Sequence, residues 1–229
     1  MAEQKFSKGE AIRFGWETTT QNLWFFVGLL IVVGLLYFIP KVVTRYLSSL
    51  LQFTRGPFDN LGVQILAASP SFFLGLAAWV LQFVAGIGLL RIVLIFCDGA
   101  KAQFSDLFSC FPLFFKYLFA SILYVLIVVG GFLLLIIPGI IWAIKYQYFG
   151  YLIVDKGLGP VAALKKSGQI TKGTKWSLFL FGLLLTGINI LGTLALVIGL
   201  FVTVPATMVA TAFVYRKLLT AAETAQVPT

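Results

Sequence analysis

One apolar stretch of the sequence, from Tyr117 to Val154, is interrupted by a single charged residue, Lys145. At about 1.5 Å per residue, a single helix over this stretch would be roughly 57 Å long. The hydrocarbon core of a bilayer is about 30 Å thick, so one helix does not fit across it even when tilted. The chain therefore has to turn within the stretch, and the strongest helix breaker near its middle is Pro138-Gly139.

The composition of the whole chain excludes a water-soluble fold. Its 229 residues are 60% hydrophobic and 11% charged, whereas a soluble domain is about 25% charged. A soluble domain of this size cannot bury so much apolar surface, so the solvent around it has to be lipid. We therefore predict a polytopic membrane protein of the all-α class.

The formal net charge of +9 would suggest a nucleic-acid partner if the protein were soluble. Here the lysines and arginines flank apolar stretches, which indicates membrane topology and lipid head groups instead of nucleic acid. The chain has two cysteines and no histidine, so we predict no metal site, no cofactor and no disulfide framework. The predicted partners are membrane lipids, in particular anionic ones, and a second copy of the chain in a homo-oligomer.

The same length argument divides the uncharged stretch from Ser177 to Tyr215 at Gly199 or Pro205. With two further apolar runs nearer the N-terminus, the chain has six predicted transmembrane helices in a single integral membrane domain, residues 1–229. Their predicted ranges are 23–40, 71–97, 117–137, 139–154, 177–198 and 200–216.

The distribution of basic residues predicts the orientation of the spans. Most of the 17 lysines and arginines lie in the N-terminal segment, in the loops after the second and fourth spans, and in the C-terminal segment. Basic residues concentrate on the cytoplasmic side of membrane proteins. We therefore predict a multi-pass protein of the cell inner membrane with both termini in the cytoplasm.

Two segments of the chain match each other without a gap. Ala11–Trp24 and Ala163–Trp176 have the same spacing between alanine and tryptophan, and each leads directly into a predicted span. The matched pairs are Arg13 with Lys165, Gly15 with Ser167, Trp16 with Gly168, Glu17 with Gln169 and Thr19 with Thr171.

A third, weaker version of this segment is Phe104–Phe119, which also leads into a span. Each version is predicted to form a short amphipathic helix on the cytoplasmic surface. The unit of surface helix, span, turn and span then occurs three times, as three pseudo-repeats. A loop that enters a membrane commonly has this character, so chance similarity is the alternative to a repeat.

Four parts of the sequence resemble one superfamily of membrane proteins. They are "GEAIRFGW" at 9–16, "FSDLF" at 104–108, "IPGIIWAIKYQYFGYLIVDKGLGPVAALKKSGQITKG" at 137–173 and "ATAFVYRKL" at 210–218. The superfamily includes the membrane domain of glycerophosphoryl diester phosphodiesterases and related six-span bacterial families, the DUF975 and YciC-like groups. One departure is Gly168, a position at which the family often has an aromatic residue.

The resemblance implies a bacterial inner-membrane protein of the six-span type, without a catalytic domain. In the phosphodiesterases, the activity belongs to a separate barrel domain with catalytic histidines and metal-binding carboxylates. The present chain has no histidine and is occupied by membrane spans. The phosphodiesterase activity therefore does not carry over to it.

Lys145 is the charged residue that most needs an explanation, because it lies within a predicted span. A charge at this depth is costly and usually marks a functional site. We predict an anion or head-group site at Lys145, with Gln147 as its polar neighbour. The alternative is a structural lysine that snorkels toward the cytoplasm or orients the short fourth span.

Gln82 and Asn189 are single polar residues inside the second and fifth predicted spans. Both are candidates for an intramembrane polar site, although hydrogen bonds between helices explain such residues more often than ligands do. Basic residues at the cytoplasmic surface are candidates for head-group contacts, and the positive-inside rule alone also accounts for them. These head-group candidates are Arg13, Arg91, Lys165, Lys166, Lys172 and Lys175.

Taken together, these features predict a non-enzymatic integral inner-membrane protein of structural, lipid-interacting or scaffold type. The basic surface helices favour this role, and the sequence has none of the common catalytic motifs. The alternative is a small transporter or channel for an anionic or amphiphilic solute, which would use Lys145. All eight acidic residues lie outside the predicted spans, which argues against proton-coupled transport.

Overall fold

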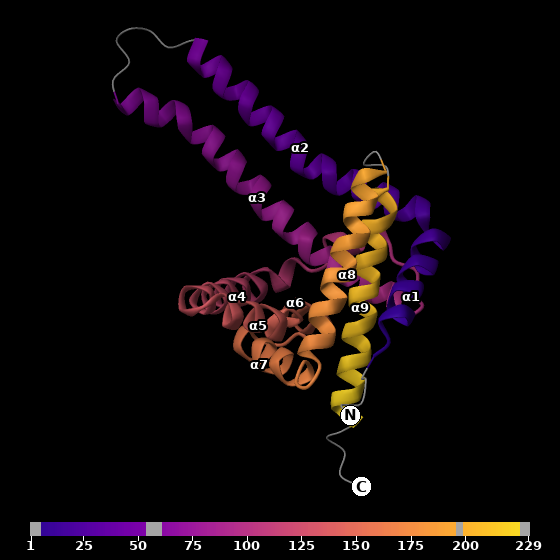
Figure 1. Cartoon of the computed structure of the whole chain (residues 1–229). Helices are drawn as coiled ribbons and strands as arrows, with labels where there is room; N and C mark the ends of the chain where they lie inside the picture. The colour runs from indigo at the N-terminus through magenta and orange to yellow at the C-terminus, as the bar shows by residue number, and fades with distance from the viewer. Residues whose placement is uncertain (1–5, 54–60, 196–198, 225–229) are drawn as a thin grey trace.

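A computed structural model of the chain describes residues 6–53, 61–195 and 199–224, and within these ranges it is all-helical, without a β-strand. The predicted all-α class is therefore confirmed. Figure 1 shows three pairs of neighbouring helices, α2 with α3, α4 with α5, and α8 with α9, which run in different directions. The elements are α1 (Lys8–Gln21), α2 (Leu23–Phe53), α3 (Leu61–Cys97), the 3-10 helices η1 (Phe104–Leu107) and η2 (Phe111–Leu113), α4 (Phe114–Leu134), α5 (Ile136–Tyr146), α6 (Phe149–Lys156), α7 (Pro160–Ile170), α8 (Lys175–Leu194) and α9 (Leu200–Thr224).

Within the described residues, four helical segments are long and apolar enough to cross a membrane. Much of their apolar surface faces outward, and Leu133, for example, is 82% exposed. Large exposed apolar surfaces are rare in soluble proteins, so these helices indicate a membrane protein. The segments are Leu23–Leu50, Phe72–Cys97, Phe104–Leu134 and Lys175–Leu194.

The first two long helices exceed their predicted ranges. Spans were predicted over 23–40 and 71–97, but α2 continues to Phe53 and α3 begins at Leu61. The predicted end of the first span was Pro40, which lies inside α2. The end of the predicted fifth span, 196–198, lies outside the described residues.

Gln82 explains how α2 continues through Pro40. Proline has no N–H, so Pro40 leaves the carbonyl oxygen of Leu36 without its usual partner in the helix. The side-chain amide of Gln82, in α3, donates a hydrogen bond to that oxygen at 3.1 Å. Gln82 thus makes an interhelical hydrogen bond, one of the two roles that the sequence left open for it.

This contact predicts a compensating pair of substitutions. Gln82→Leu should lower the free energy of unfolding by about 1–3 kcal/mol, because it leaves a partly buried carbonyl oxygen unpaired. In a Pro40→Ala chain the new backbone N–H pairs with the Leu36 oxygen, so Gln82→Leu should then have little effect. Thermal midpoints of the four chains in detergent measure the coupling. If Gln82→Leu lowered the thermal midpoint equally in the native and the Pro40→Ala chains, Gln82 would not act through the Leu36 oxygen.

The turn between the predicted third and fourth spans lies at Leu135 rather than at Pro138-Gly139. Leu135 is extended and separates α4 from α5. Pro138 therefore falls in the first turn of α5, where no helical hydrogen bond needs its N–H. Gly139 lets the two helices approach each other, since a Cβ on it would lie 2.6 Å from the Phe132 ring. The predicted turn was wrong by three residues because a proline is tolerated just after a helix begins.

The range predicted as one helix, 139–154, contains two helices, α5 and α6. Side chains that insert into the hydrogen-bond ladder of a helix interrupt it. Ser167 of α7 and Thr171, the C-cap residue of α7, donate hydrogen bonds to the carbonyl oxygen of Lys145, at 3.1 and 3.0 Å. Ser167 also accepts a hydrogen bond from the N–H of Tyr148, at 3.2 Å. These hydroxyl groups replace the missing ladder bonds, and the chain bends between α5 and α6.

The ends of α3 and α6 meet at one arginine of α9. Arg216 of α9 donates to Asp155, at the end of α6, at 2.8 Å and to Asp98, which follows α3, at 2.6 Å. Tyr215 donates to the other carboxylate oxygen of Asp155, at 2.9 Å. We call Asp98, Asp155, Tyr215 and Arg216 the arginine clasp. It joins α3, α6 and α9 beside the buried core, in which Tyr151 stacks on Tyr215.

Candidate functional site

A cavity of about 640 Å³ opens between α4, α5, α7 and the first residue of α8. Small-molecule sites commonly have volumes of about 300–1,000 Å³. We call this cavity the lysine pocket, because four lysines line it. Its lining residues are Leu123, Ile127, Lys145, Tyr146, Val161, Leu164, Lys165, Gly168, Gln169, Lys172 and Lys175.

One face of α7 forms the floor of the lysine pocket. Residues three and four apart lie next to each other on a helix, and the α7 residues of the lining follow this spacing. They combine two apolar side chains with a lysine, a glutamine and a glycine, so the floor is amphipathic. These residues are Val161, Leu164, Lys165, Gly168 and Gln169.

Lys172 and Lys175 reach the pocket because the chain turns between α7 and α8. Gly173 has a φ of +84°, a left-handed conformation that glycine adopts readily. The turn places Lys175 at the first position of α8.

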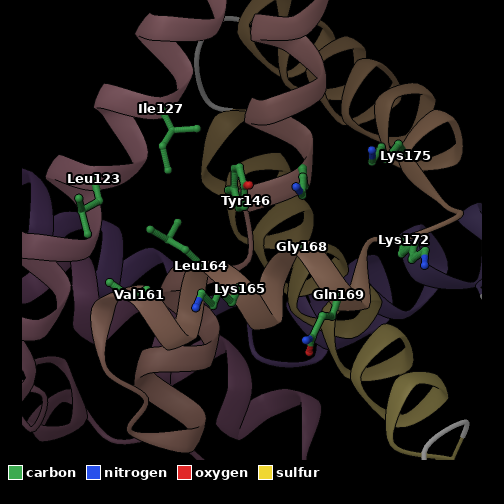
Figure 2. A pocket seen from close by; sticks show the side chains of 11 residues that line it. Leu123, Ile127, Tyr146, Val161, Leu164, Lys165, Gly168, Gln169, Lys172 and Lys175 are labelled. Carbon is green, nitrogen blue, oxygen red and sulfur yellow. The ribbon is translucent and has the colours of Figure 1, made fainter.

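Two of the four lysines lie apart from most of the apolar lining, whereas Lys165 lies beside Val161 (Figure 2). In Figure 2, Leu123, Ile127 and Val161 gather on one side of the pocket, and Lys172 and Lys175 lie on the other. No acidic residue is among the described lining residues. The pocket therefore suits a molecule with a negatively charged end and an apolar end.

Lys145 lies across Gly168 at the edge of the pocket. A Cβ on Gly168 would lie 3.0 Å from Cε of Lys145, closer than an ordinary van der Waals contact. Gly168 thus makes room for the aliphatic part of the half-buried lysine. The Nζ atom lies 4.7 Å from the centre of the Tyr146 ring, in a cation–π contact.

Ser167, Thr171, Gly168 and Tyr146 belong to this site, although the sequence analysis assigned no site role to them. Ser167 and Thr171 hold the backbone at Lys145 and so fix where its side chain begins. A signal for Ser167 and Thr171 existed in the repeat comparison, which matched both to residues near the N-terminus. Gly168 also stood out as a departure from the family pattern. Nothing in the sequence placed α7 against Lys145, however.

The residues predicted as one intramembrane polar site do not come together. Lys145 lines the pocket, whereas Gln147 is the C-cap of α5 and does not. Gln82 bonds to α2, as described above. Asn189 of α8 donates to the hydroxyl oxygen of Thr207 in α9 at 3.2 Å, and so joins two helices.

Three of the six head-group candidates meet at the lysine pocket: Lys165, Lys172 and Lys175. The other three lie elsewhere. Lys166 follows Lys165 but is not among the lining residues of the pocket, and Arg91 is exposed on α3. Arg13 pairs with Glu17 on α1 at 2.9 Å. Among the described residues, no group of three or more histidine, cysteine, aspartate or glutamate side chains is placed to hold a metal ion.

Comparison with known families gives one match. The family described as a protein of unknown function, DUF975, matches residues 10–222, which is nearly the whole chain. No curated protein and no solved structure matches the sequence. The resemblance to the phosphodiesterase membrane domain stays a prediction.

Proposed function

The chain belongs to the DUF975 family, and we propose that it is a non-enzymatic integral inner-membrane protein that binds anionic lipid in the lysine pocket. One observation carries this proposal: four lysines and four aliphatic residues together line a cavity of about 640 Å³. Basic residues near a membrane surface attract anionic lipids by about 1 kcal/mol each. In this proposal the lysines hold the phosphate of the head group, and the aliphatic residues take the first part of an acyl chain.

The chemistry of the lining supports a binding role over a catalytic one. A transfer or hydrolysis site generally needs a nucleophile next to a base, or an acid–base pair. The described lining residues are lysines, a glutamine, a tyrosine, a glycine and aliphatic residues. Such a set attracts and orients an anion, and no step of bond breaking follows from it.

The proposed topology has six membrane crossings in three units, with both termini in the cytoplasm. Asp98, Asp155 and Arg216 stand at the ends of the second, fourth and sixth predicted spans, and their contacts in the arginine clasp support a common side for these ends. Trp24 and Trp176, at the starts of two predicted spans, are 86% and 71% exposed, as is typical of tryptophans at a membrane interface. Labelling of single cysteines from each side of the membrane tests the orientation.

The lysine pocket predicts a difference between two neighbouring lysines. The protein in nanodiscs should bind phosphatidylglycerol and not phosphatidylcholine. Lys165→Met removes a pocket charge and should weaken the binding of phosphatidylglycerol about five-fold, the equivalent of about 1 kcal/mol. Lys166→Met removes the same charge outside the pocket and should leave the affinity unchanged.

Titration of a fluorescent phosphatidylglycerol measures both variants against the native chain. Equal losses in Lys165→Met and Lys166→Met would mean that the surface charge as a whole attracts the lipid, without a pocket. Equal binding of phosphatidylglycerol and phosphatidylcholine by the native chain would remove the proposal.

The alternative function, transport of an anionic or amphiphilic solute, uses the same pocket. Its support is the half-burial of Lys145 beside the apolar residues of α4. Proteoliposomes loaded with glycerol phosphate, which lacks acyl chains, separate the two functions. A flux that Lys145→Met abolishes would establish transport. No flux, together with lipid binding that glycerol phosphate does not displace, would leave the lipid site as the function.

A further inference from the structure

The charged residues of the arginine clasp occupy matching places in the three predicted units. Each lies at or near the end of the last span of its unit, in the order α3, α6 and α9, and all three contact each other through the arginine. They therefore give a common reference point for comparing the units. Ten residues before Asp98, Asp155 and Arg216 stand Gly88, Lys145 and Ala206.

Two of these positions are close approaches between backbones. A Cβ on Gly88 would overlap the backbone of Leu107 in η1. A Cβ on Gly15, in α1, would overlap the carbonyl oxygen of Ala206 in α9. In both places the surface segment of one unit, η1 or α1, lies across the last span of another unit, α3 or α9. We call each such contact a crossing, and at both a glycine makes the close approach possible.

The third position, Lys145, is crossed in the same way by α7. Its carbonyl oxygen accepts a hydrogen bond from Ser167, just as the carbonyl oxygen of Ala206 faces Gly15. Sequence matching paired Gly15 with Ser167 without any knowledge of these contacts. Each surface element thus packs on the last predicted span of the unit before it, and α1 packs on α9 in the same way.

We infer that these three crossings are equivalent in the fold. We also infer that Lys145 and Gly168 make the crossing of α7 the ligand site. At the other two crossings, Gly88 and Ala206 occupy the position that corresponds to Lys145. The packing at a crossing therefore depends on the backbone and does not require a lysine side chain. The nature of the ligand, an anionic phospholipid head group, rests on the function proposed above. Because Lys145 and Gly168 occur together only at the crossing of α7, the chain binds one such lipid, at this crossing.

The equivalent crossing at α1 differs from the lysine pocket in its lining and in its charge. Trp16 stands where α7 has Gly168, the residue that leaves room for the Lys145 stem. The hollow beside α1 is lined by Glu10 and Glu17 as well as Arg13. There Arg13 pairs with Glu17 and Lys217 with Glu10, so the carboxylates offset the cations, whereas no acidic residue is among the described lining residues of the lysine pocket.

Two substitutions test this inference in nanodiscs that contain phosphatidylglycerol. Lys145→Ala gives the crossing the side chain that α9 has at its own crossing. Gly168→Trp introduces at this crossing the tryptophan that α1 has at the matched position, Trp16, and its side chain should fill the pocket. Each should abolish the single bound phosphatidylglycerol counted by native mass spectrometry, while the thermal midpoint stays within about 4 °C of the native value.

Ser167→Ala is the contrasting variant, because it removes the hydrogen bonds of the crossing itself. It should lower the thermal midpoint by more than either substitution above. A large drop in the midpoint of Lys145→Ala would show that the lysine is structural and would overturn the equivalence. Lipid that persists in Lys145→Ala and Gly168→Trp would also overturn the inference, although lipid binding itself would stand.

The midpoints are also measured without phosphatidylglycerol, which separates this inference from the proposed function. If the native chain binds no anionic lipid, the proposed function fails and the assignment of a ligand to this crossing fails with it. A stable Lys145→Ala chain would then still support the equivalence of the three crossings.

Discussion

Replacing Arg216 with methionine is expected to lower the free energy of unfolding by about 2–4 kcal/mol. The guanidinium bridges Asp155 of α6 and Asp98, which follows α3, at 2.8 and 2.6 Å. The side chain of Asp155 is 13% exposed, so it would be left largely buried with only the Tyr215 hydroxyl as a partner. Removing one member of a buried ion pair is costly because the other charge stays desolvated. The thermal midpoint in detergent, or unfolding in a graded denaturant, measures the loss.

The neighbouring lysine provides a matched control for this change. Lys217 pairs with Glu10 at 3.1 Å, and both side chains are about half exposed. Lys217→Met should therefore cost less than about 1 kcal/mol, as exposed ion pairs do. Arg216→Lys should fall between the two, since an ammonium group lacks the planar fork that spans two carboxylates. If Arg216→Met were as mild as Lys217→Met, the clasp would not hold the three helices together.

The features that the sequence predicted correctly depend on residues close together along the chain. The predicted start of the first span, Leu23, is the start of α2, and the predicted end of the second span, Cys97, is the end of α3. The start of α9 after Gly199 follows from the length of an apolar run and the hydrocarbon thickness. Each of these needs no knowledge of a distant partner.

The features that the sequence missed depend on partners far along the chain. α2 passes through Pro40 because Gln82 supplies a hydrogen bond from α3. The break after α5 depends on the hydroxyl groups of Ser167 and Thr171. A proline or a hydroxyl group has no fixed effect on a helix until its partner is placed, so local patterns alone cannot position these boundaries.

The candidate site was predicted as two separate features. Lys145 was identified by its depth in an apolar run, and Lys165, Lys172 and Lys175 by their place in a basic loop. The packing of α7 on α5 brings them to one cavity. Lys166 has the same local character as its neighbour yet does not line the pocket, so the choice between them needs the orientation of α7.

Gly88→Ala is expected to destabilise the protein by about 3 kcal/mol or more, because a Cβ at this position would overlap the backbone of Leu107. Overpacking of a core costs about 1–3 kcal/mol where side chains can shift. Here the obstacle is a backbone, which moves only if η1 is displaced from α3. The change therefore tests whether the surface element crosses the helix at this point.

Gly86→Ala is the matched control, two residues earlier on the same helix. No described atom lies within 4 Å of a Cβ built there, so alanine should stabilise the helix by about 0.5–1 kcal/mol. Both substitutions replace a glycine of α3 with alanine, but Gly86→Ala should raise the free energy of unfolding and Gly88→Ala should lower it. The difference between their thermal midpoints therefore measures the effect of the contact between Gly88 and η1. If Gly88→Ala were also stabilising, η1 would not cross α3 at Gly88, and the three crossings would no longer be equivalent.

The same comparison can be made on α1 with Gly15→Ala and Gly9→Ala. A Cβ on Gly15 would overlap the backbone of Ala206, whereas no described atom lies within 4 Å of a Cβ on Gly9. Agreement between the two pairs of substitutions would establish a shared geometry at two of the three crossings.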